Sequence, residues 1–246
     1  MNDNILEVDR LCVTYSTTEG DFRAVHEVSF ALGTNESLGI IGESGCGKST
    51  LAFSIMHHLP PTASINGSIR FKDHDILKMT VRQVQSYRGN RIAMVYQNPY
   101  SSLNPSLTIG KQLDEIGFIH RKLSKHEARK ASIEVLELMN IGDPERIIKR
   151  YPHQISGGIQ QRICIGMAVL CRPDVMILDE PTTALDVTTE AVILDLLNTL
   201  RDELHMSLIY ISHDMGVINK VADNIAVMYS GEIVEQGSKV DVFNHP

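Results

Sequence analysis

One stretch of the sequence combines residue types that bind phosphate. Residues 42–49 read Gly-Glu-Ser-Gly-Cys-Gly-Lys-Ser and fit the pattern G-x-x-x-x-G-K-[ST]. The glycines of such a loop let backbone N–H groups turn toward an anion, and the following helix adds the positive end of its dipole. Lys48 supplies a charge for the β- and γ-phosphates of a nucleotide, and Ser49 supplies a hydroxyl for Mg²⁺. We therefore predict a nucleotide-phosphate site, in preference to a glycine-rich turn that ends in Lys-Ser by chance.

The segments on either side of this loop have the patterns that such a site requires. Residues 37–41 (Ser-Leu-Gly-Ile-Ile) predict a short buried strand. After the loop, Leu51, Ile55 and Leu59 are spaced four apart and predict one face of a helix. A strand, the glycine-rich loop and a helix, in this order, are the context in which the motif binds phosphate.

A second chemical signal is an apolar strand that ends in two carboxylates. Residues 174–180 predict a buried apolar strand that ends in the two carboxylates Asp179 and Glu180. An aspartate delivered beside a phosphate loop can hold Mg²⁺, and the neighbouring glutamate can polarise water as a general base. The alternative is a strand followed by an acidic turn, which is the weaker interpretation beside a phosphate-binding motif.

Two further polar residues stand at predicted carboxyl ends of strands. Gln97 follows a strand over residues 91–96, and His213 follows a strand over residues 207–212. Ligands of open α/β sheets bind at that edge. A lone histidine is more often structural, but the edge shared with Glu180 favours a functional role for His213.

Two weaker signals concern a second anion site and an aromatic residue. Residues 156–162 begin with Ser-Gly-Gly and predict a helix whose first N–H groups can bind an anion, although a serine N-cap with two loop glycines has the same pattern. Tyr15, at the end of a predicted strand, can stack on an adenine ring. From its position alone, an ordinary strand-end tyrosine is the favoured interpretation.

The rest of the pattern predicts a sheet region interrupted by helices. Strands are expected at residues 5–14, on a sheet edge, and at 25–30 and 68–71. Residues 226–234 indicate a hairpin with Gly231 in its turn.

Residues 98–173 contain no strand pattern. They begin with a proline-bounded loop at residues 98–105, and residues 124–127 (Ser-Lys-His-Glu) fit a capping box. One helical face then follows, lined by Ala128, Ala131, Val135 and Leu138. We predict a helical insertion packed beside the sheet.

The composition restricts the classes of protein to which the chain can belong. Its 246 residues suffice for one large domain or two small ones, and a hydrophobic content of 43% suits a globular core. A formal charge of −7 argues against extensive sequence-independent binding of nucleic acid. No apolar run approaches the ~20 residues that span a bilayer, and residues 1–4 lack the features of a signal peptide. A cytoplasmic location is expected.

The four cysteines (Cys12, Cys46, Cys164 and Cys171) form no CxxC pair and no metal-binding pattern with histidine. Small buried thiols in a reducing compartment are the favoured interpretation. Cys46 differs because it lies in the phosphate loop, where a helix N-terminus can lower the pKa of a thiol. We assign it no chemical role.

Taken together, these motifs and their order resemble the ATP-binding cassette (ABC) ATPases, and the likeness covers nearly the whole chain. Residues 155–160 (Ile-Ser-Gly-Gly-Ile-Gln) are similar to the family signature Leu-Ser-Gly-Gly-Gln, with Ile in place of Leu and a second Ile after the glycines. Under this resemblance Tyr15 falls at the adenine-stacking A-loop, which reverses the interpretation made from position alone. Gln97 corresponds to the Q-loop, and Asp179 and Glu180 correspond to Walker B and the catalytic glutamate. The D-loop corresponds to Ala184, Leu185 and Asp186, and the H-loop corresponds to His213.

The resemblance implies an α/β fold of the P-loop NTPase type, with a mixed-sheet core, an antiparallel β edge and a helical subdomain. Residues 1–246 are then expected to form one ABC ATPase domain. Its catalytic core comprises residues 1–97 and 174–246, and residues 98–173 form the helical subdomain that carries the signature.

The resemblance also implies that ATP and Mg²⁺ bind. Gln97, Glu180 and His213 are the expected catalytic residues, and Ser49, Gln97 and Asp179 are the expected metal ligands. The expected nucleotide-binding residues are Tyr15, Gly42, Glu43, Ser44, Gly45, Cys46, Gly47, Lys48, Ser49, Thr50, Ser156, Gly157, Gly158, Gln160 and Asp186.

A finer likeness points to the peptide/nickel importer branch of this family. It rests on residues 151–158 and 180–188, and on Asn-Pro at 98–99 followed by Ser-Leu-Asn-Pro at 102–105. Residues 88–90 (Arg-Gly-Asn) look like the subunit that pairs with a second, non-identical ATPase. The resemblance implies a head-to-tail dimer, in which each ATP lies between one P-loop and the Ser-Gly-Gly of the partner. The dimer would drive transmembrane permease subunits at the cytoplasmic face of the cell membrane.

The implied function is ATP-driven uptake of peptides, with a solute-binding protein as an indirect partner and no nucleic acid. Nickel or another small solute is an alternative cargo, and a soluble ABC ATPase of DNA repair or translation is an alternative class. Tyr100 and Leu103 are apolar or part-apolar residues in the otherwise polar stretch 98–105. We expect them to dock a permease helix, with local packing as the alternative.

Overall fold

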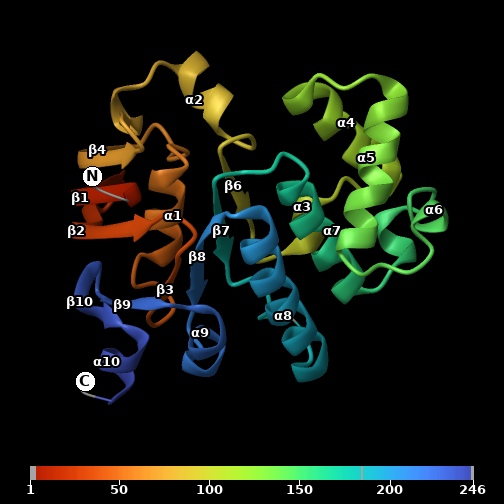
Figure 1. The fold of residues 1–246 in the computed structure, drawn as a ribbon. Coiled ribbons are helices and arrows are strands. Elements are labelled where there is room, and N and C mark those ends of the chain that lie inside the picture. The colour runs from red at the N-terminus through yellow and green to blue at the C-terminus, as the bar shows by residue number, and fades with distance from the viewer. Residues whose placement is uncertain (1–3, 184, 245–246) are drawn as a thin grey trace.

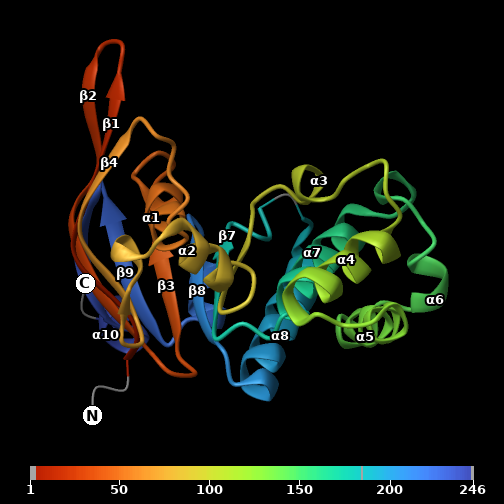
Figure 2. The same ribbon diagram turned by 90° about the horizontal axis from the view of Figure 1, so that it is seen from above.

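The computed structural model describes residues 4–183 and 185–244. In this part of the chain two β-sheets lie beside each other, and a group of helices extends from one side of them (Figures 1 and 2). None of its helices is long and apolar enough to cross a bilayer. The arrangement agrees with the predicted α/β fold, which combines a mixed sheet, an antiparallel sheet and a helical region.

The larger sheet has six strands in the order β10-β9-β3-β8-β7-β6. Its members are β3 (Ser37–Ile41), β6 (Ile92–Val95), β7 (Val175–Asp179), β8 (Ser207–Ser212), β9 (Asn224–Tyr229) and β10 (Glu232–Ser238). Strands β6, β7, β8, β3 and β9 run parallel, and β10 pairs antiparallel with β9. The carboxyl ends of the parallel strands therefore lie at one edge of the sheet.

Alternate residues of the central strands face two separate hydrophobic cores. In β8, Leu208 and Tyr210 belong to one core, and Ile209 and Ile211 belong to the other. Successive side chains of a strand point to opposite faces, so both faces of this sheet are buried. Burial on both faces explains why these strands appear in the sequence as continuous apolar runs rather than as alternation.

The smaller sheet is antiparallel, with the order β2-β1-β4-β5. Its strands are β1 (Asn4–Thr17), β2 (Gly20–Gly33), β4 (Ala63–Phe71) and β5 (His74–Asp75). Because β1 pairs with both β2 and β4, the prediction that residues 5–14 form a sheet edge is wrong. The alternation of these residues reflects which face is buried, whereas pairing with β4 joins distant segments and leaves no local pattern.

Helices cover both faces of the mixed sheet and form the group at its side. They are α1 (Lys48–Ile55), α2 (Val81–Tyr87), α3 (Pro99–Ser102), α4 (Ile109–Arg121), α5 (Lys125–Leu138), α6 (Pro144–Ile147), α7 (Gly157–Val169), α8 (Val187–Leu204), α9 (Met215–Val221) and α10 (Lys239–Asn244), with 3₁₀ turns at Ile76–Lys78 and Pro152–Gln154. Helix α1 packs between the two sheets, and its Leu51 and Ile55 share a core with both of them (Figure 2). Helices α8 and α9 contribute to the opposite core, and α3 to α7 lie to one side (Figure 1).

The helical region matches its prediction in most parts. Among the described residues, 98–173 contain no strand. Ser124 and Glu127 form the predicted capping box, in which the Ser124 N–H donates to Oε2 of Glu127 at 2.9 Å. Residues 98–105 are not a simple loop, because they contain α3. Asn98 caps this short helix by accepting a hydrogen bond of 2.9 Å from the N–H of Tyr100, and proline suits the first helical position.

Three other local predictions have mixed outcomes. Leu103 is 2% exposed and belongs to a buried core, so the prediction that it docks a partner is wrong and the alternative of local packing holds. Tyr100 is 64% exposed. The helix after the phosphate loop ends at Ile55, before Leu59 is reached. The predicted hairpin of β9 and β10 is confirmed, with Gly231 in its turn at φ +89°.

Candidate active site

The phosphate loop connects β3 to α1, as its sequence context predicted. Gly45 and Gly47 adopt positive φ values of 82° and 106°, and a Cβ on Gly47 would lie 2.4 Å from the carbonyl oxygen of Ala24. Lys48 is 5% exposed. Its Nζ donates to the carbonyl oxygens of Gly42 at 2.7 Å and Glu43 at 2.8 Å. The ammonium group is therefore held over the loop, where it can meet an incoming phosphate.

Three predicted catalytic residues meet at the carboxyl edge of the mixed sheet. Gln97 follows β6, Glu180 follows β7 and His213 follows β8. The Gln97 amide Nε2 donates to Oε2 of Glu180 at 3.0 Å, and the His213 ring Nδ1 lies 3.1 Å from Oε1 of Glu180. Thr183 adds a hydroxyl donor to Oε2 at 3.0 Å. These contacts hold the Glu180 carboxylate in one orientation, as a general base requires.

Asp179 is the buried carboxylate of the site. Burial raises its pKa, the Glu180 charge adds to this effect, and a hydrogen bond from the Ser49 hydroxyl and the charge of Lys48 oppose it. A carboxylate that the fold holds in a poorly solvated position gains from a nearby cation. Its oxygen and the hydroxyl of Ser49 are the hard donors that Mg²⁺ prefers.

The residues present therefore fit Mg²⁺ bound together with nucleotide phosphates. Among residues 4–183 and 185–244, no group of three or more His, Cys, Asp and Glu side chains could hold a metal ion by themselves. An ion at Asp179 and Ser49 would need additional oxygen ligands, and the phosphates of a nucleotide on the loop supply such oxygens. This agrees with the usual Mg²⁺ sites of phosphoryl-transfer enzymes, which have few protein ligands.

The loop and the predicted catalytic residues line one cavity of about 930 Å³. Its walls include every residue from Gly42 to Thr50 except Cys46, together with Tyr15, Gln97, Asp179, Glu180 and His213. The Tyr15 hydroxyl lies 3.3 Å from Oγ1 of Thr50. The structure thus brings together the predicted phosphate, metal, catalytic and adenine-contact residues from five separate stretches of the chain.

Phe22 lines the same cavity and was missed by the sequence analysis. It lies directly opposite Tyr15 in the β1–β2 pairing, and it is 59% exposed. A hairpin with its turn at residues 18–19 places positions 15 and 22 across from each other, so recognising that turn could have identified it. Thr183, Met215 and Val227 also line the cavity without having been predicted.

The residues of the predicted second anion site lie apart from this cavity. Ser156 is the N-cap residue of α7, and Gly157 and Gly158 begin that helix, whose N-terminus has no side-chain cap. Asp186 caps α8 by accepting a hydrogen bond from the N–H of Thr189 at 3.0 Å. Ala184, the first residue of the predicted D-loop, lies outside the described residues.

Gln160 requires a correction. Its side chain is 1% exposed, and its Nε2 donates to the carbonyl oxygens of Pro152 at 3.0 Å and Ile155 at 3.2 Å. A side chain buried in this way has no surface for a nucleotide, so the prediction that it binds the nucleotide directly is not supported. Gln160 instead fixes the segment that leads into the Ser-Gly-Gly turn.

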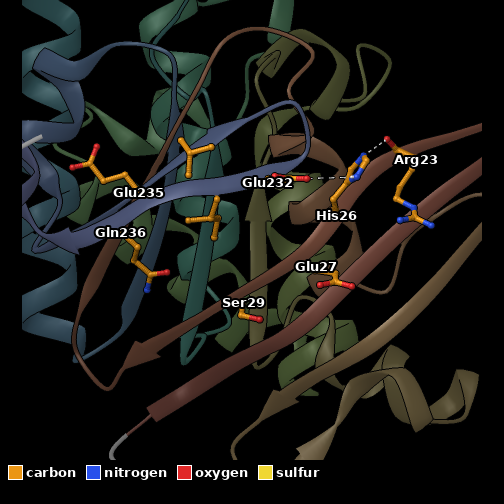
Figure 3. A pocket seen from close by; sticks show the side chains of 9 residues that line it. Arg23, His26, Glu27, Ser29, Glu232, Glu235 and Gln236 are labelled. Carbon is orange, nitrogen blue, oxygen red and sulfur yellow. Dashed lines mark hydrogen bonds and ion pairs between the residues drawn. The ribbon is translucent and has the colours of Figure 1, made fainter.

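A second cavity, of about 560 Å³, lies between β2 and β10 and contains none of the predicted site residues. In Figure 3, His26 stands between the Glu232 side chain and the carbonyl group of Arg23. The backbone links this region to the phosphate loop, because the Gly231 carbonyl accepts from the His26 N–H at 2.8 Å and the Gly231 N–H donates to the Cys46 carbonyl at 3.0 Å. The turn of the β9–β10 hairpin therefore braces the loop.

The prediction of buried thiols holds for three of the four cysteines. All four are free, and Cys46, Cys164 and Cys171 are buried. Burial raises the pKa of Cys164 to about 12, and it raises the pKa of Cys171 to about 11 against the opposing charge of Arg121. Thiols with such values are unreactive at neutral pH, which agrees with the structural interpretation of these two residues.

Comparison with known proteins finds relatives over nearly the whole chain. The profile of the family described as ABC transporter matches residues 25–183. The dipeptide transport ATP-binding protein DppD of Bacillus subtilis (strain 168) is 46% identical over 246 residues, which cover 99% of this chain and 73% of that protein. The oligopeptide transport ATP-binding protein OppD of Salmonella typhimurium is 44% identical over 242 residues, which cover 98% and 72%.

A solved structure also matches along nearly the full length. The ATP-binding cassette MJ0796, described as a dimer in a post-hydrolysis state bound to ADP and Pi, has a TM-score of 0.84 at 27% identity, and the match covers 95% of this chain and 98% of that chain. The fold and the sequence comparisons thus point in the same direction.

Proposed function

We propose that this chain, which belongs to the ABC transporter family, is the ATP-hydrolysing subunit of a peptide importer. As a member of this family the chain is an ATPase with ATP as its substrate. The proposal of a peptide importer rests on the relatives named for dipeptide and oligopeptide transport, which are 46% and 44% identical to it. The cargo itself would be selected by a permease and a solute-binding protein.

The observation that carries the ATPase function is the environment of Glu180. Its carboxylate lies between Gln97 and His213, at 3.0 Å and 3.1 Å, and lines the same cavity as Lys48. Glu180 takes a proton from water as the water oxygen attacks the γ-phosphorus, and ADP leaves with the electron pair of the broken bond. Lys48 and the loop N–H groups stabilise the phosphate charge.

Ser49 and Asp179, together with Gln97, are the residues that would hold Mg²⁺. When bound, this ion neutralises negative charge on the phosphates. Tyr15 and Phe22 provide aromatic surface for the adenine ring, and the link from Tyr15 to Thr50 places that surface beside the phosphate loop. The nucleotide would thus extend from the β1–β2 hairpin to the carboxyl edge of the mixed sheet.

We infer that the complete site requires a second ATPase chain. Ser156, Gly157 and Gly158 do not line the nucleotide cavity of their own chain, yet they begin a helix whose N-terminus suits an anion. A head-to-tail dimer would bring these residues to the ATP of the partner. The similar cassette MJ0796 is described as dimeric, and the resemblance of residues 88–90 favours a non-identical partner.

A cavity of about 400 Å³ offers a place for the permease. It lies where α1 and β6 meet α4 and α7, and Met56, Tyr96, Ile116, Cys164 and Met167 are among its lining residues. An apolar groove between the catalytic core (residues 1–97 and 174–246) and the helical subdomain (residues 98–173) suits a cytoplasmic helix of a membrane subunit. The chain would then act at the cytoplasmic face of the membrane as a peripheral subunit.

Three measurements test this function. Lys48→Ala should abolish high-affinity ATP binding by the isolated chain, because it removes the charge aimed at the phosphates. Wild-type chain should hydrolyse ATP slowly when dilute, with a specific activity that rises with concentration or with addition of the partner ATPase. Wild-type affinity in Lys48→Ala would reject the phosphate site, and robust activity of a proven monomer would reject the shared site. Uptake of labelled peptide by the reconstituted transporter tests the cargo.

A further inference from the structure

Gly158 of the Ser-Gly-Gly turn lies against Thr189 in the first turn of α8. A Cβ placed on Gly158 would stand 2.7 Å from the methyl carbon Cγ2 of Thr189, which is closer than side-chain carbons approach. Helix α7 belongs to the group at the side of the sheet, whereas α8 follows β7 of the mixed sheet (Figure 2). The contact therefore joins the two regions at the position where α7 begins.

Thr189 also holds Asp186, the residue before α8. The hydroxyl Oγ1 of Thr189 donates to Oδ2 of Asp186 at 2.7 Å, and its N–H donates to Oδ1 at 3.0 Å. The hydroxyl and the methyl group are attached to the same Cβ, so one rotamer satisfies both contacts. Rotation about the Cα–Cβ bond is restricted in a β-branched side chain. Thr189 is therefore a rigid link between Asp186 and Gly158.

An ordinary helix cap explains only part of this arrangement. Capping needs the bond from the N–H of residue 189 to Asp186, and any residue other than proline provides that bond. The second bond from the hydroxyl and the methyl packed on Gly158 are additional features. They link Asp186, which is itself exposed, with Gly158 in the turn that begins α7. Neither Asp186 nor Gly158 lines the nucleotide cavity of its own chain.

We propose that Thr189 is a positioning residue that fixes the position of Asp186 relative to the Ser-Gly-Gly turn. When the turn docks on the ATP of the partner, the loop of Asp186 is then brought to the same interface in a fixed position. This inference rests on the proposed head-to-tail dimer. It assigns Thr189 no contact with ATP, and ATP binding by the isolated chain is independent of it.

Three variants separate the two contacts, and a fourth serves as the control. Thr189→Val removes the hydroxyl and keeps the shape, Thr189→Ser removes the methyl and keeps the hydroxyl, and Thr189→Ala removes both. Thr188→Val is the matched control, because Thr188 is an exposed neighbour in the same turn. The measurements are ATP affinity and Tm of the chain, and kcat and KM of the wild-type and variant chains assembled with their partner ATPase.

We expect Thr189→Val and Thr189→Ser each to lower kcat of the assembled enzyme, roughly 3- to 30-fold for a coupling contact. The decrease of kcat in Thr189→Ala should be no greater than the larger of the decreases in Thr189→Val and Thr189→Ser. The reason is that loss of either contact already removes the effect of the link. ATP affinity of the chain should match wild type in every variant. Thr188→Val should behave as wild type throughout.

Two results would overturn the role of Thr189. One is normal kcat in Thr189→Ser, which would make the methyl contact irrelevant. The other is a decrease of kcat that is matched by a decrease of Tm, because Thr189 would then only stabilise the first turn of α8. Failure of the proposed dimer is seen separately, in wild-type chain, as hydrolysis that needs neither higher concentration nor a partner.

Discussion

Gln97 and Glu180 stand 83 residues apart in the sequence, and the Gln97 amide donates a hydrogen bond of 3.0 Å to the Glu180 carboxylate. Gln97 ends the strand region before α3, so the residue that touches the proposed base also leads into the helices at the side of the sheet. A displacement of those helices would alter the hydrogen bonding of Glu180. The hydrogen bond from Gln97 to Glu180 would therefore make ATP hydrolysis depend on the position of the helical region.

Glu180→Gln should bind ATP but hydrolyse it very slowly. The change keeps the shape and removes the charge that accepts a proton, and loss of a general base typically costs about 10²–10⁴-fold in rate. Single-turnover hydrolysis by chain assembled with its partner measures this loss, and ATP-bound dimers should accumulate.

Thr183→Val is the matched control for this change. It deletes one hydroxyl donor to Glu180, which lies at 3.0 Å, and leaves the base itself in place. Its rate should lie between those of wild type and Glu180→Gln. Near-normal turnover by Glu180→Gln would remove Glu180 from the role of base.

The parts of the site that the sequence predicted are those with strong local signals. The bounds of β3 and β8 agree with the predicted strands, because a fully buried strand is a short apolar run between polar residues. The phosphate loop and the capping box at Ser124 are likewise defined by residues a few positions apart. The convergence of Gln97, Glu180 and His213 followed from the rule that parallel strands share a carboxyl edge.

The errors arose where distant residues decide the outcome. Pairing of β1 with β4 turned an expected edge strand into an inner one. Burial of Gln160 and Leu103 depends on the packing of helices against each other, and no local pattern records it. The edge strand, Gln160 and Leu103 were therefore missed because tertiary contacts decide their environment. Phe22 is different, because the local turn at residues 18–19 places it opposite Tyr15 and could have been recognised in the sequence.

Asp179→Asn should raise the stability of nucleotide-free protein while abolishing Mg²⁺-dependent hydrolysis. Burial raises the pKa of Asp179, so the folded protein disfavours its negative charge at neutral pH. A neutral amide of the same shape removes this cost, and it also removes the ligand for the metal. Thermal unfolding without nucleotide and a Mg²⁺ titration of ATPase activity measure the two effects.

Ser49→Ala provides a useful comparison with Asp179→Asn. It deletes the hydroxyl that donates to Asp179 and leaves the buried charge less satisfied, so nucleotide-free protein should become less stable. Opposite changes of Tm in the two variants are therefore expected. A lower Tm for Asp179→Asn, or retained dependence on Mg²⁺, would contradict the assignment.

Gly231→Ala should destabilise the protein and weaken ATP binding. Its φ of +89° is strained for alanine, and the added Cβ would lie 2.6 Å from a ring carbon of His26 and 3.0 Å from the Ala24 carbonyl oxygen. The hairpin turn braces the phosphate loop through the Cys46 carbonyl, so the displacement reaches the nucleotide site. Strain of this kind costs on the order of 1–3 kcal/mol, and denaturant unfolding and ATP titration measure it.

Gly20→Ala isolates the steric part of this effect. Gly20 has a φ of +123°, but a Cβ there would meet no atom within 4 Å. It therefore carries backbone strain without a clash, and it is not among the residues that line the nucleotide cavity. Gly231→Ala should lose more stability than Gly20→Ala and should alone lose ATP affinity. Equal effects in both variants would rule out bracing by the hairpin turn.

Tyr100→Ala and Leu103→Ala should have different effects, because Tyr100 of α3 lies at the surface and Leu103, the C-cap residue of α3, is packed in a core. Leu103 is 2% exposed, and deletion of a buried leucine side chain costs about 2–5 kcal/mol. Leu103→Ala should therefore unfold more easily in denaturant. Tyr100 is 64% exposed, so Tyr100→Ala should leave stability and ATP affinity of the chain unchanged. It should instead weaken assembly with the permease or uncouple hydrolysis from peptide uptake.

Tyr100→Phe distinguishes the two parts of the tyrosine side chain. The Tyr100 hydroxyl lies 3.4 Å from the position that a Cβ on Gly157 would occupy, so the ring also lies beside the turn that begins α7. If the ring docks a permease helix, Tyr100→Phe should transport normally and Tyr100→Ala should not. If the hydroxyl acts on the turn, both variants should lower kcat of the assembled ATPase equally, even without permease. Normal transport by Tyr100→Ala would exclude a docking role, because the docking surface would then have lost its aromatic ring without consequence.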